Sequence, residues 1–174
     1  MDLALLVLRL VVGLTFAAHG AQKLFGAFGG HGIEGTAGFF EQIGLRPGKL
    51  HGWAAAITEF FGGLAIALGI VTPIPAAALI GVMTAAVLTV HVKNGFFNTN
   101  QGFEFNLTLA AALFALAGIG AGGWSLDNAL GIDMTGAAWA LGALGAGLLG
   151  GVGAVLGGRF ASRHSREHGH PSPA

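Results

Sequence analysis

The sequence predicts an all-α protein, folded as a transmembrane helical bundle. Of its 174 residues, 53% are hydrophobic and only 9% are charged, and the mean hydropathy is +0.72. A soluble domain usually carries about 25% charged residues, so this chain cannot cover a water-exposed surface with charge. Its hydrophobic runs are continuous rather than alternating, which indicates helices and not the strands of a membrane barrel.

Five stretches predict helices that cross the membrane, because a hydrocarbon core about 30 Å thick needs about 20 apolar residues. They cover residues 3–25, 53–71, 74–92, 105–121 and 136–158. Met1-Asp2 carries no cation ahead of the first run, so we expect that helix to be retained and not removed as a signal peptide. Pro73 and Pro75 mark a tight turn and suit the first turn of the third helix.

These elements predict a four-helix core over residues 1–127, a fifth Gly-rich transmembrane helix within 128–159, and a disordered cytoplasmic tail over 160–174. The loop after the first helix is expected to hold a short interfacial helix near residues 36–43, where two adjacent Phe residues accompany Glu and Gln. Seven of the eight Lys and Arg residues fall outside the middle of any span. The positive-inside rule then predicts a multi-pass protein of the cell inner membrane, with its N-terminus outside and its C-terminus cytoplasmic.

Composition excludes several classes of function. The formal net charge is zero and basic blocks are absent, which argues against a nucleic-acid partner. The absence of cysteine excludes disulfides, thiolate metal sites and thiol redox chemistry within this chain. The glycines follow helical runs and not a strand, so a self-contained NAD or flavin site is not indicated.

Polar residues gather at one predicted depth, and alternating helix directions bring them level. Charges within spans are costly and are usually paired or functional. The first and third helices end on this side, and the second and fourth begin there. The residues concerned are His19, Gln22, Lys23, Glu59, His91, Lys93, Asn94, Gln101, Glu104 and Asn106. Arg9 lies nearer the outer side, and Glu59, the one acid well inside a span, is its expected counter-charge.

Three interpretations of this cluster stay open. The first is structural: buried ion pairs and hydrogen bonds that fix the helix register. The second is a site for a small organic ligand such as a quinone. There Glu59, His91 and His19 are the catalytic candidates, and the ligand-binding candidates are Arg9, Lys23, Lys93, Asn94, Glu104 and Asn106. The third is a metal site formed by His19, Glu59, His91 and Glu104, which is less favoured because their spacing is not that of a helical metal motif.

Small residues recur at four-residue intervals in the fifth helix. The stripe consists of Gly142, Ala146, Gly150, Ala154 and Gly158. Such a stripe allows close approach of helices in lipid. It predicts docking of the fifth helix on the bundle, with a homo-oligomer formed through this helix as the alternative.

Several motifs in order resemble the DoxX family of small multi-pass membrane proteins. They lie between about Leu3 and Asp127. They are LRL at 8–10 with the following glycines and KLFG at 23–26, Glu59 with GGL at 62–64, HVKNGFF at 91–97, QGFEFNL at 101–107 and WSLD at 124–127. The resemblance implies a four-helix membrane core and a link to quinone-dependent oxidoreductases, among them a subunit of a thiosulfate:quinone oxidoreductase. The fifth helix and the His-rich tail are departures from the family pattern.

Two functional hypotheses follow. The first is a membrane subunit of a quinone-linked oxidoreductase, or a binder of another small hydrophobic ligand, which works with a redox partner protein or a quinone in the lipid bilayer. In it, Glu59 and His91 handle protons, and Lys23 and Lys93 bind ligand oxygens. The alternative is a non-catalytic membrane assembly factor, carrier or interaction scaffold.

Overall fold

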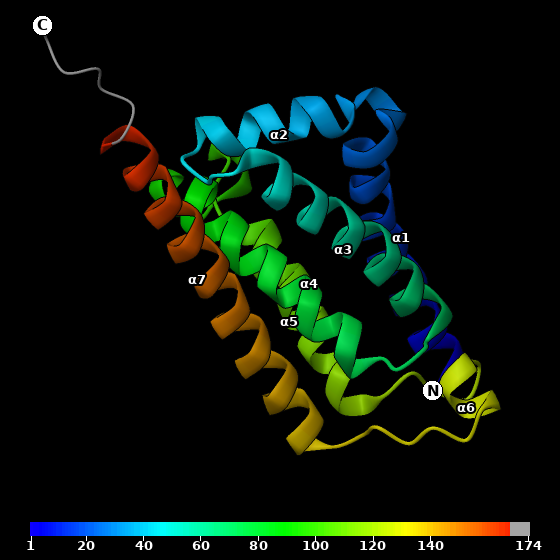
Figure 1. Cartoon of the computed structure of the whole chain (residues 1–174). Helices are drawn as coiled ribbons and strands as arrows, with labels where there is room; N and C mark the ends of the chain where they lie inside the picture. Colours follow the sequence, from blue (N-terminus) through cyan, green and yellow to red (C-terminus); the bar gives the residue numbers. More distant parts are fainter. Residues whose placement is uncertain (168–174) are drawn as a thin grey trace, which may run out of the picture.

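The computed structural model describes residues 1–167, with backbone alone for the last four, and within this range it contains helices and no strands. Five helices form a bundle: α1 (Asp2–Phe25), α3 (Gly48–Leu68), α4 (Pro73–Ala86), α5 (Glu104–Ile119) and α7 (Ala137–Glu167). The short helix α2 (Gly32–Gln42) crosses one end of the bundle, and α6 (Leu126–Ala129) lies at the other end (Figure 1). The predicted all-α transmembrane bundle is confirmed.

Four helical segments in residues 1–167 are long and apolar enough to cross a membrane: Asp2–Phe25, Gly48–Leu68, Pro73–Asn94 and Ala137–Arg163. Helix α5 is apolar but has 16 residues, a length of about 24 Å at 1.5 Å per residue. Successive long helices run in opposite directions, so the start of α1 and the end of α7 lie at opposite ends of the bundle (Figure 1). The chain is therefore a membrane protein with an alternating arrangement of helices.

Two helix boundaries differ from the sequence-based expectation. Helix α3 begins at Gly48 and not near residue 53. The polar and glycine-rich stretch before Trp53 is therefore part of the helix. Helix α7 extends to Glu167, past the expected boundary at residue 159. The rest of the expected tail, residues 168–174, lies outside the described residues.

Glycines bring α1 and α3 into close contact. A Cβ atom at Gly20 would stand 2.3 Å from the amide nitrogen of Phe60, and one at Gly63 would stand 2.5 Å from the amide nitrogen of Ala17. No real side chain fits at these distances, so only glycine permits this backbone approach. The close packing fixes the register of α1 against α3, which determines the residues that meet across them.

Helix α7 docks on α4, as the small residues predict, but through a face one position away from the predicted stripe. A Cβ at Gly147 would stand 2.7 Å from the carbonyl oxygen of Ala77, and one at Gly151 would stand 2.5 Å from that of Gly81. Gly142 and Gly150, from the predicted stripe, have no neighbour within 4 Å of that position. Gly158, the last residue of the predicted stripe, does pack on the bundle, against His51 and Leu45, whereas the docking on α4 uses the adjacent face.

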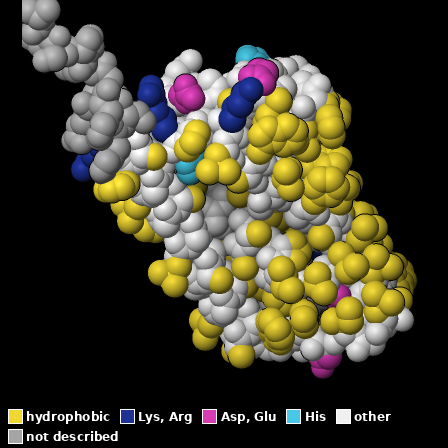
Figure 2. Space-filling model, in the orientation of Figure 1, with side chains coloured by type: hydrophobic (Ala, Val, Ile, Leu, Met, Phe, Trp, Pro, Cys, Tyr) yellow, Lys and Arg dark blue, Asp and Glu magenta, His cyan; other side chains and the backbone are white. Residues whose placement is uncertain are grey.

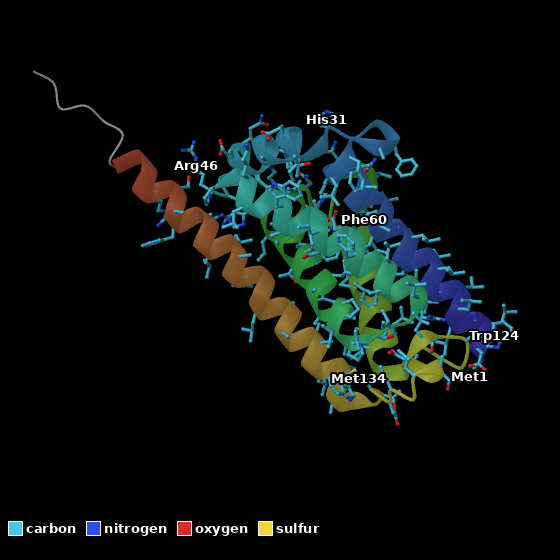
Figure 3. All side chains as sticks on the ribbon, turned by 45° about the vertical axis from the view of Figure 1, so that its right-hand side comes forward. Met1, His31, Arg46, Phe60, Trp124 and Met134 are labelled. Atoms are coloured by element: carbon cyan, nitrogen blue, oxygen red, sulfur yellow. The ribbon has the colours of Figure 1, made fainter. Side chains whose placement is uncertain are left out.

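A buried polar network closes the end of the bundle that contains the N-terminus, where Met1 and Trp124 lie in Figure 3. Arg9 is 1% exposed and donates to the backbone carbonyls of Ala67 and Trp124. Asp127 accepts hydrogen bonds from the amide of Val71, at 2.6 Å, and from the hydroxyl of Thr72, at 2.8 Å. The segment after α5 is thereby held over the turn between α3 and α4.

Glu59 is not the counter-charge of Arg9, which corrects the expectation from the sequence. Arg9 lies about four turns further toward the N-terminal end of the bundle than the residue that meets Glu59 on α1, which is Lys23. The partners of Arg9 are carbonyl oxygens, with the Asp127 carboxylate in the same network.

Candidate functional site

A cavity of about 760 Å³ lies between α3, α4 and α7, with α2 at one end. Figure 2 shows a hollow on this face of the molecule. Most of the lining residues are Ala, Gly and other apolar residues. The polar side chains that line it are Lys23, His51, Thr58, Glu59, Thr89 and His91. A mainly apolar cavity with a few polar groups is the usual form of a small-molecule site.

Lys23 and Glu59 form an ion pair in the wall of the cavity. The Lys23 ammonium donates to Oε2 of Glu59, and the two side chains are 27% and 5% exposed. Lys23 lies one turn after Gly20, so the close approach of α1 to α3 delivers its side chain to Glu59. Removing one partner of a buried ion pair leaves an uncompensated charge. A substitution of Lys23 or Glu59 alone is therefore expected to lower the stability of the protein.

A widened turn places His91 at the cavity. Residues Val87–His91 form a π-helical turn at the end of α4, a feature often found at functional sites. Nδ1 of His91 lies 2.7 Å from the backbone carbonyl of Gln101. A carbonyl oxygen only accepts, so Nδ1 carries the proton, and Nε2 of the neutral ring is left as a hydrogen-bond acceptor.

The Gln101 carbonyl is itself held in place. It also accepts from the side chain of Asn94 at 3.2 Å, and Gln101 adopts a left-handed backbone conformation with φ of 61°. Such a conformation is uncommon for a residue other than glycine. The loop between α4 and α5 thus orients the His91 ring.

Three polar residues of the cavity were missed from the sequence. His51 stacks on Phe40 of α2, with ring centroids 6.3 Å apart and an interplanar angle of 17°. It precedes Glu59 by eight residues, and this spacing places both on one face of a helix. Hydropathy starts this helix near residue 53 and so leaves His51 outside it, whereas α3 begins at Gly48. Thr58 directly precedes Glu59 in the sequence, and Thr89 lies two residues before His91. Hydropathy alone does not single out either threonine.

The other predicted site residues lie outside the cavity. His19 and Lys93 are exposed. Glu104 accepts from the amide of Asn98 at 2.9 Å, and Asn106 is buried beside the sulfur of Met83. Arg9 belongs to the network at the opposite end, and Asn94 supports the Gln101 carbonyl. Of the predicted set, Lys23, Glu59 and His91 line the cavity, and Lys23 and Glu59 contact each other.

The four-residue metal alternative receives no support from the geometry. Among the residues that the structure describes, no group of three or more His, Asp or Glu side chains lies close enough to hold a metal ion. His19 is exposed on α1 and does not line the cavity.

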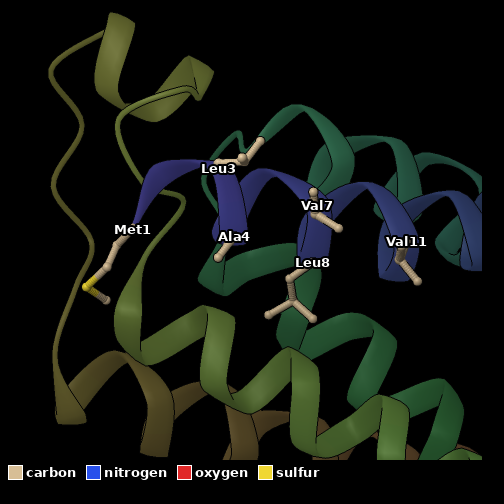
Figure 4. Close-up of a pocket in the computed structure, with 6 residues that line it drawn as sticks. All are labelled: Met1, Leu3, Ala4, Val7, Leu8 and Val11. Carbon is tan, nitrogen blue, oxygen red and sulfur yellow. The ribbon is translucent and has the colours of Figure 1, made fainter.

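A second hollow lies along the first three turns of α1 (Figure 4). Its lining residues are Met1, Leu3, Ala4, Val7, Leu8 and Val11. This surface offers no polar side chain to orient a ligand, and it is the kind of surface that a membrane helix presents to lipid.

Comparisons with known proteins place the chain in a family. The DoxX family model matches residues 4–92, which include Lys23, Glu59 and His91. A Bacillus subtilis (strain 168) protein named "Putative oxidoreductase CatD" is 31% identical over 117 residues, covering 67% of this chain and 81% of that protein. "Uncharacterized membrane protein Rv3486" of Mycobacterium tuberculosis (strain ATCC 25618 / H37Rv) is 26% identical over 137 residues, covering 73% of this chain and 81% of that protein.

No solved structure matches the chain. The family model extends over the bundle helices α1, α3 and α4 and the short helix α2, and the similarity to the two relatives covers two thirds or more of the chain. Of the motifs that the sequence shares with the family, three contribute a residue to the cavity: Lys23, Glu59 and His91. The chain belongs to the DoxX family of membrane proteins.

Proposed function

We propose that this protein is a membrane subunit of a quinone-linked oxidoreductase and binds a quinone-type ligand in the cavity between α3, α4 and α7. The observation that supports this most strongly is the combination of an apolar cavity of about 760 Å³ with the Lys23–Glu59 ion pair and His91 in its wall. A quinone is an apolar ring with carbonyl oxygens, and these need a few donors within apolar walls. The name of the Bacillus relative, "Putative oxidoreductase CatD", agrees with this chemistry.

Each polar group has a role in this proposal. The Lys23 ammonium donates to a carbonyl oxygen of the ligand. Glu59 and His91 Nε2 exchange protons with the ring oxygens as general acid and base. Reduction of a quinone to a quinol takes up electrons as well as protons. A redox partner protein supplies the electrons, because the chain has no cysteine to carry them.

The proposal places the cavity on the cytoplasmic side of the cell inner membrane. On the face in Figure 2, the Lys and Arg side chains lie at the end near α2, with acidic ones beside them, and the opposite end of that face displays acidic side chains without basic ones. Cation-rich ends of membrane helices face the cytoplasm. The N-terminus is then outside, and protons reach the cavity from the cytoplasm.

Ligand binding tests the proposal directly. In purified protein, we expect saturable equilibrium binding of decylubiquinone and a loss of affinity of about tenfold or more in Glu59→Gln, because a charge-assisted interaction is lost. Glu34→Gln is the matched control, since Glu34 pairs with Lys49 on the surface, where the two side chains are 74% and 67% exposed. Its affinity should equal that of the wild type.

A structural role for the ion pair gives a different outcome. The double variant Lys23→Gln/Glu59→Gln removes both charges and avoids an unpaired buried ion. We expect it to fold, as measured by gel filtration and circular dichroism, and to bind decylubiquinone as weakly as Glu59→Gln. Wild-type affinity in a folded double variant, or no saturable binding by the wild type, contradicts the proposal.

A further inference from the structure

The cavity is long in one direction. Helix α4 and the π-helical turn that follows it line the cavity from Ile74 to His91, a distance of about 25 Å at 1.5 Å per residue. This length approaches the roughly 30 Å of a bilayer core. A single quinone ring fills only a small part of such a cavity. A long, linear molecule matches the length of the cavity better.

The wall away from the polar end consists of small residues that face a gap and not another helix. Helices α3 and α7 make little contact with each other, and the cavity lies between them over α4. Ala78, Ala146 and Gly150 line it and are exposed. All three belong to membrane-spanning segments, so the open side of the cavity faces the acyl chains of the bilayer.

The charges at the polar end favour an uncharged head group. Among the described lining residues, the one Lys is paired with the one Glu, and the remaining titratable groups are His51 and His91. A phosphate or carboxylate head group would need a free cation to balance its burial. A ligand with carbonyl oxygens needs only hydrogen-bond partners.

We propose that the cavity takes a membrane-dissolved quinone with a long hydrocarbon side chain, which enters sideways from the bilayer. The ring lies at the Lys23–Glu59 pair, and the side chain lies along the small residues of α4 and α7. This inference rests on the proposed function and adds the substrate class: lipid-soluble, long-chain quinones and not water-soluble ones. Burial of successive CH₂ groups along the cavity supplies much of the affinity.

A side chain added at the open side tests the inference. Gly150 has no neighbour within 4 Å of a Cβ position and lines the cavity, so Gly150→Leu fills the cavity without a clash with the bundle. Gly153, on the same helix, also has no such neighbour and does not line the cavity. Gly153→Leu is therefore the matched control for helix propensity, added volume and partitioning of the probe into lipid.

The probes are ubiquinone-0, which has no side chain, and decylubiquinone, both titrated into protein in lipid nanodiscs. We expect Gly150→Leu to lose about tenfold or more in affinity for decylubiquinone and to bind ubiquinone-0 as the wild type does. Gly153→Leu should match the wild type for both. Should Gly150→Leu fail to fold, Ala146→Leu on the same open side replaces it.

The outcomes separate the two proposals. Equal affinity of Gly150→Leu and Gly153→Leu for decylubiquinone, with Glu59-dependent binding retained, overturns the side-chain site and leaves the ring site standing. Binding of neither probe by the wild type overturns the proposed function. Displacement of decylubiquinone by a phospholipid in the wild type, but not in Gly150→Leu, would assign the cavity to bilayer lipid and overturn the inference.

Discussion

At the scale of single residues, each buried charge has a specific partner, and the partners divide the molecule into two ends. Glu59 meets Lys23 at the cavity. Arg9 and Asp127 meet backbone groups at the opposite end. The sequence identifies these residues as exceptional because charges are rare within spans. It cannot assign their partners, because the pairing of Lys23 and not Arg9 with Glu59 depends on the register that Gly20 and Gly63 impose.

Asp127→Asn should destabilise the protein without affecting the cavity. The carboxylate accepts three hydrogen bonds from Val71 and Thr72, and an amide oxygen accepts them more weakly and also brings an NH₂ group. We expect a loss of about 1–3 kcal/mol, measured as thermal unfolding in detergent, with unchanged affinity for decylubiquinone. Asp133→Asn, at an exposed position, is the control. Equal stability of both variants would show that Asp127 does not hold the loop.

The His91 ring has a defined tautomer in this structure. Because Nδ1 faces the Gln101 carbonyl at 2.7 Å, nitrogen NMR of ¹⁵N-histidine-labelled protein should find Nδ1 protonated and Nε2 bare in the neutral ring. His91→Phe identifies the resonance. A proton on Nε2 would remove the acceptor that the proposed proton transfer requires.

At the scale of elements, hydropathy locates the helices but not their contacts. The five apolar runs correspond to α1, α3, α4, α5 and α7. The start of α3 was placed too late, because glycine and charge near Gly48 hide a helical turn from a hydropathy scale. The glycines of α7 occur on several faces at once, and the contact with α4 uses Gly147 and Gly151, one residue away from the predicted stripe. A glycine repeat indicates that close packing is available and does not say where the partner lies.

Glycines at the α1–α3 contact should be the least tolerant of substitution. Gly63→Ala places a methyl group 2.5 Å from two backbone atoms of α1. We expect a loss of stability of about 1–3 kcal/mol in thermal unfolding, and a weaker Lys23–Glu59 contact. Gly142→Ala, with no neighbour within 4 Å, is the control and should unfold at or above the wild-type temperature. The same loss in both variants would contradict the proposed tight contact.

At the scale of the whole molecule, alternation of helix direction is the property that creates the site. Lys23 ends α1, Glu59 lies within α3 and His91 ends the α4 segment. Only opposite directions of neighbouring helices bring these positions to one cavity (Figure 1). The sequence predicted one cluster of polar residues at this depth, and of that cluster Lys23, Glu59 and His91 line the cavity. The depth of a residue in the membrane follows from the topology of the helices. The side of the helix on which its side chain lies follows from packing, and His19 lies on the exposed side of α1.

The absence of native cysteine makes the orientation simple to measure. Gln42→Cys near the end of α2 and Asp133→Cys after α6 are both at exposed positions at opposite ends of the bundle. With the cytoplasm at the α2 end, a membrane-impermeant maleimide should label Asp133→Cys in cells with a permeabilised outer barrier and leave Gln42→Cys unlabelled until the membrane is disrupted. The reverse pattern would place the cavity on the other side.

Photo-crosslinking tests the central claim most directly, namely that distant residues of this bundle form one quinone site. A quinone with a photoreactive group on its side chain is irradiated with the protein in nanodiscs, and the labelled peptides are identified by mass spectrometry. We predict labels on α4 between residues 74 and 91 and on α7 between 146 and 154, which excess decylubiquinone removes and which are reduced in Glu59→Gln. Labels confined to the lipid-facing side of α1 around Val7, or labels that decylubiquinone does not displace, would contradict it.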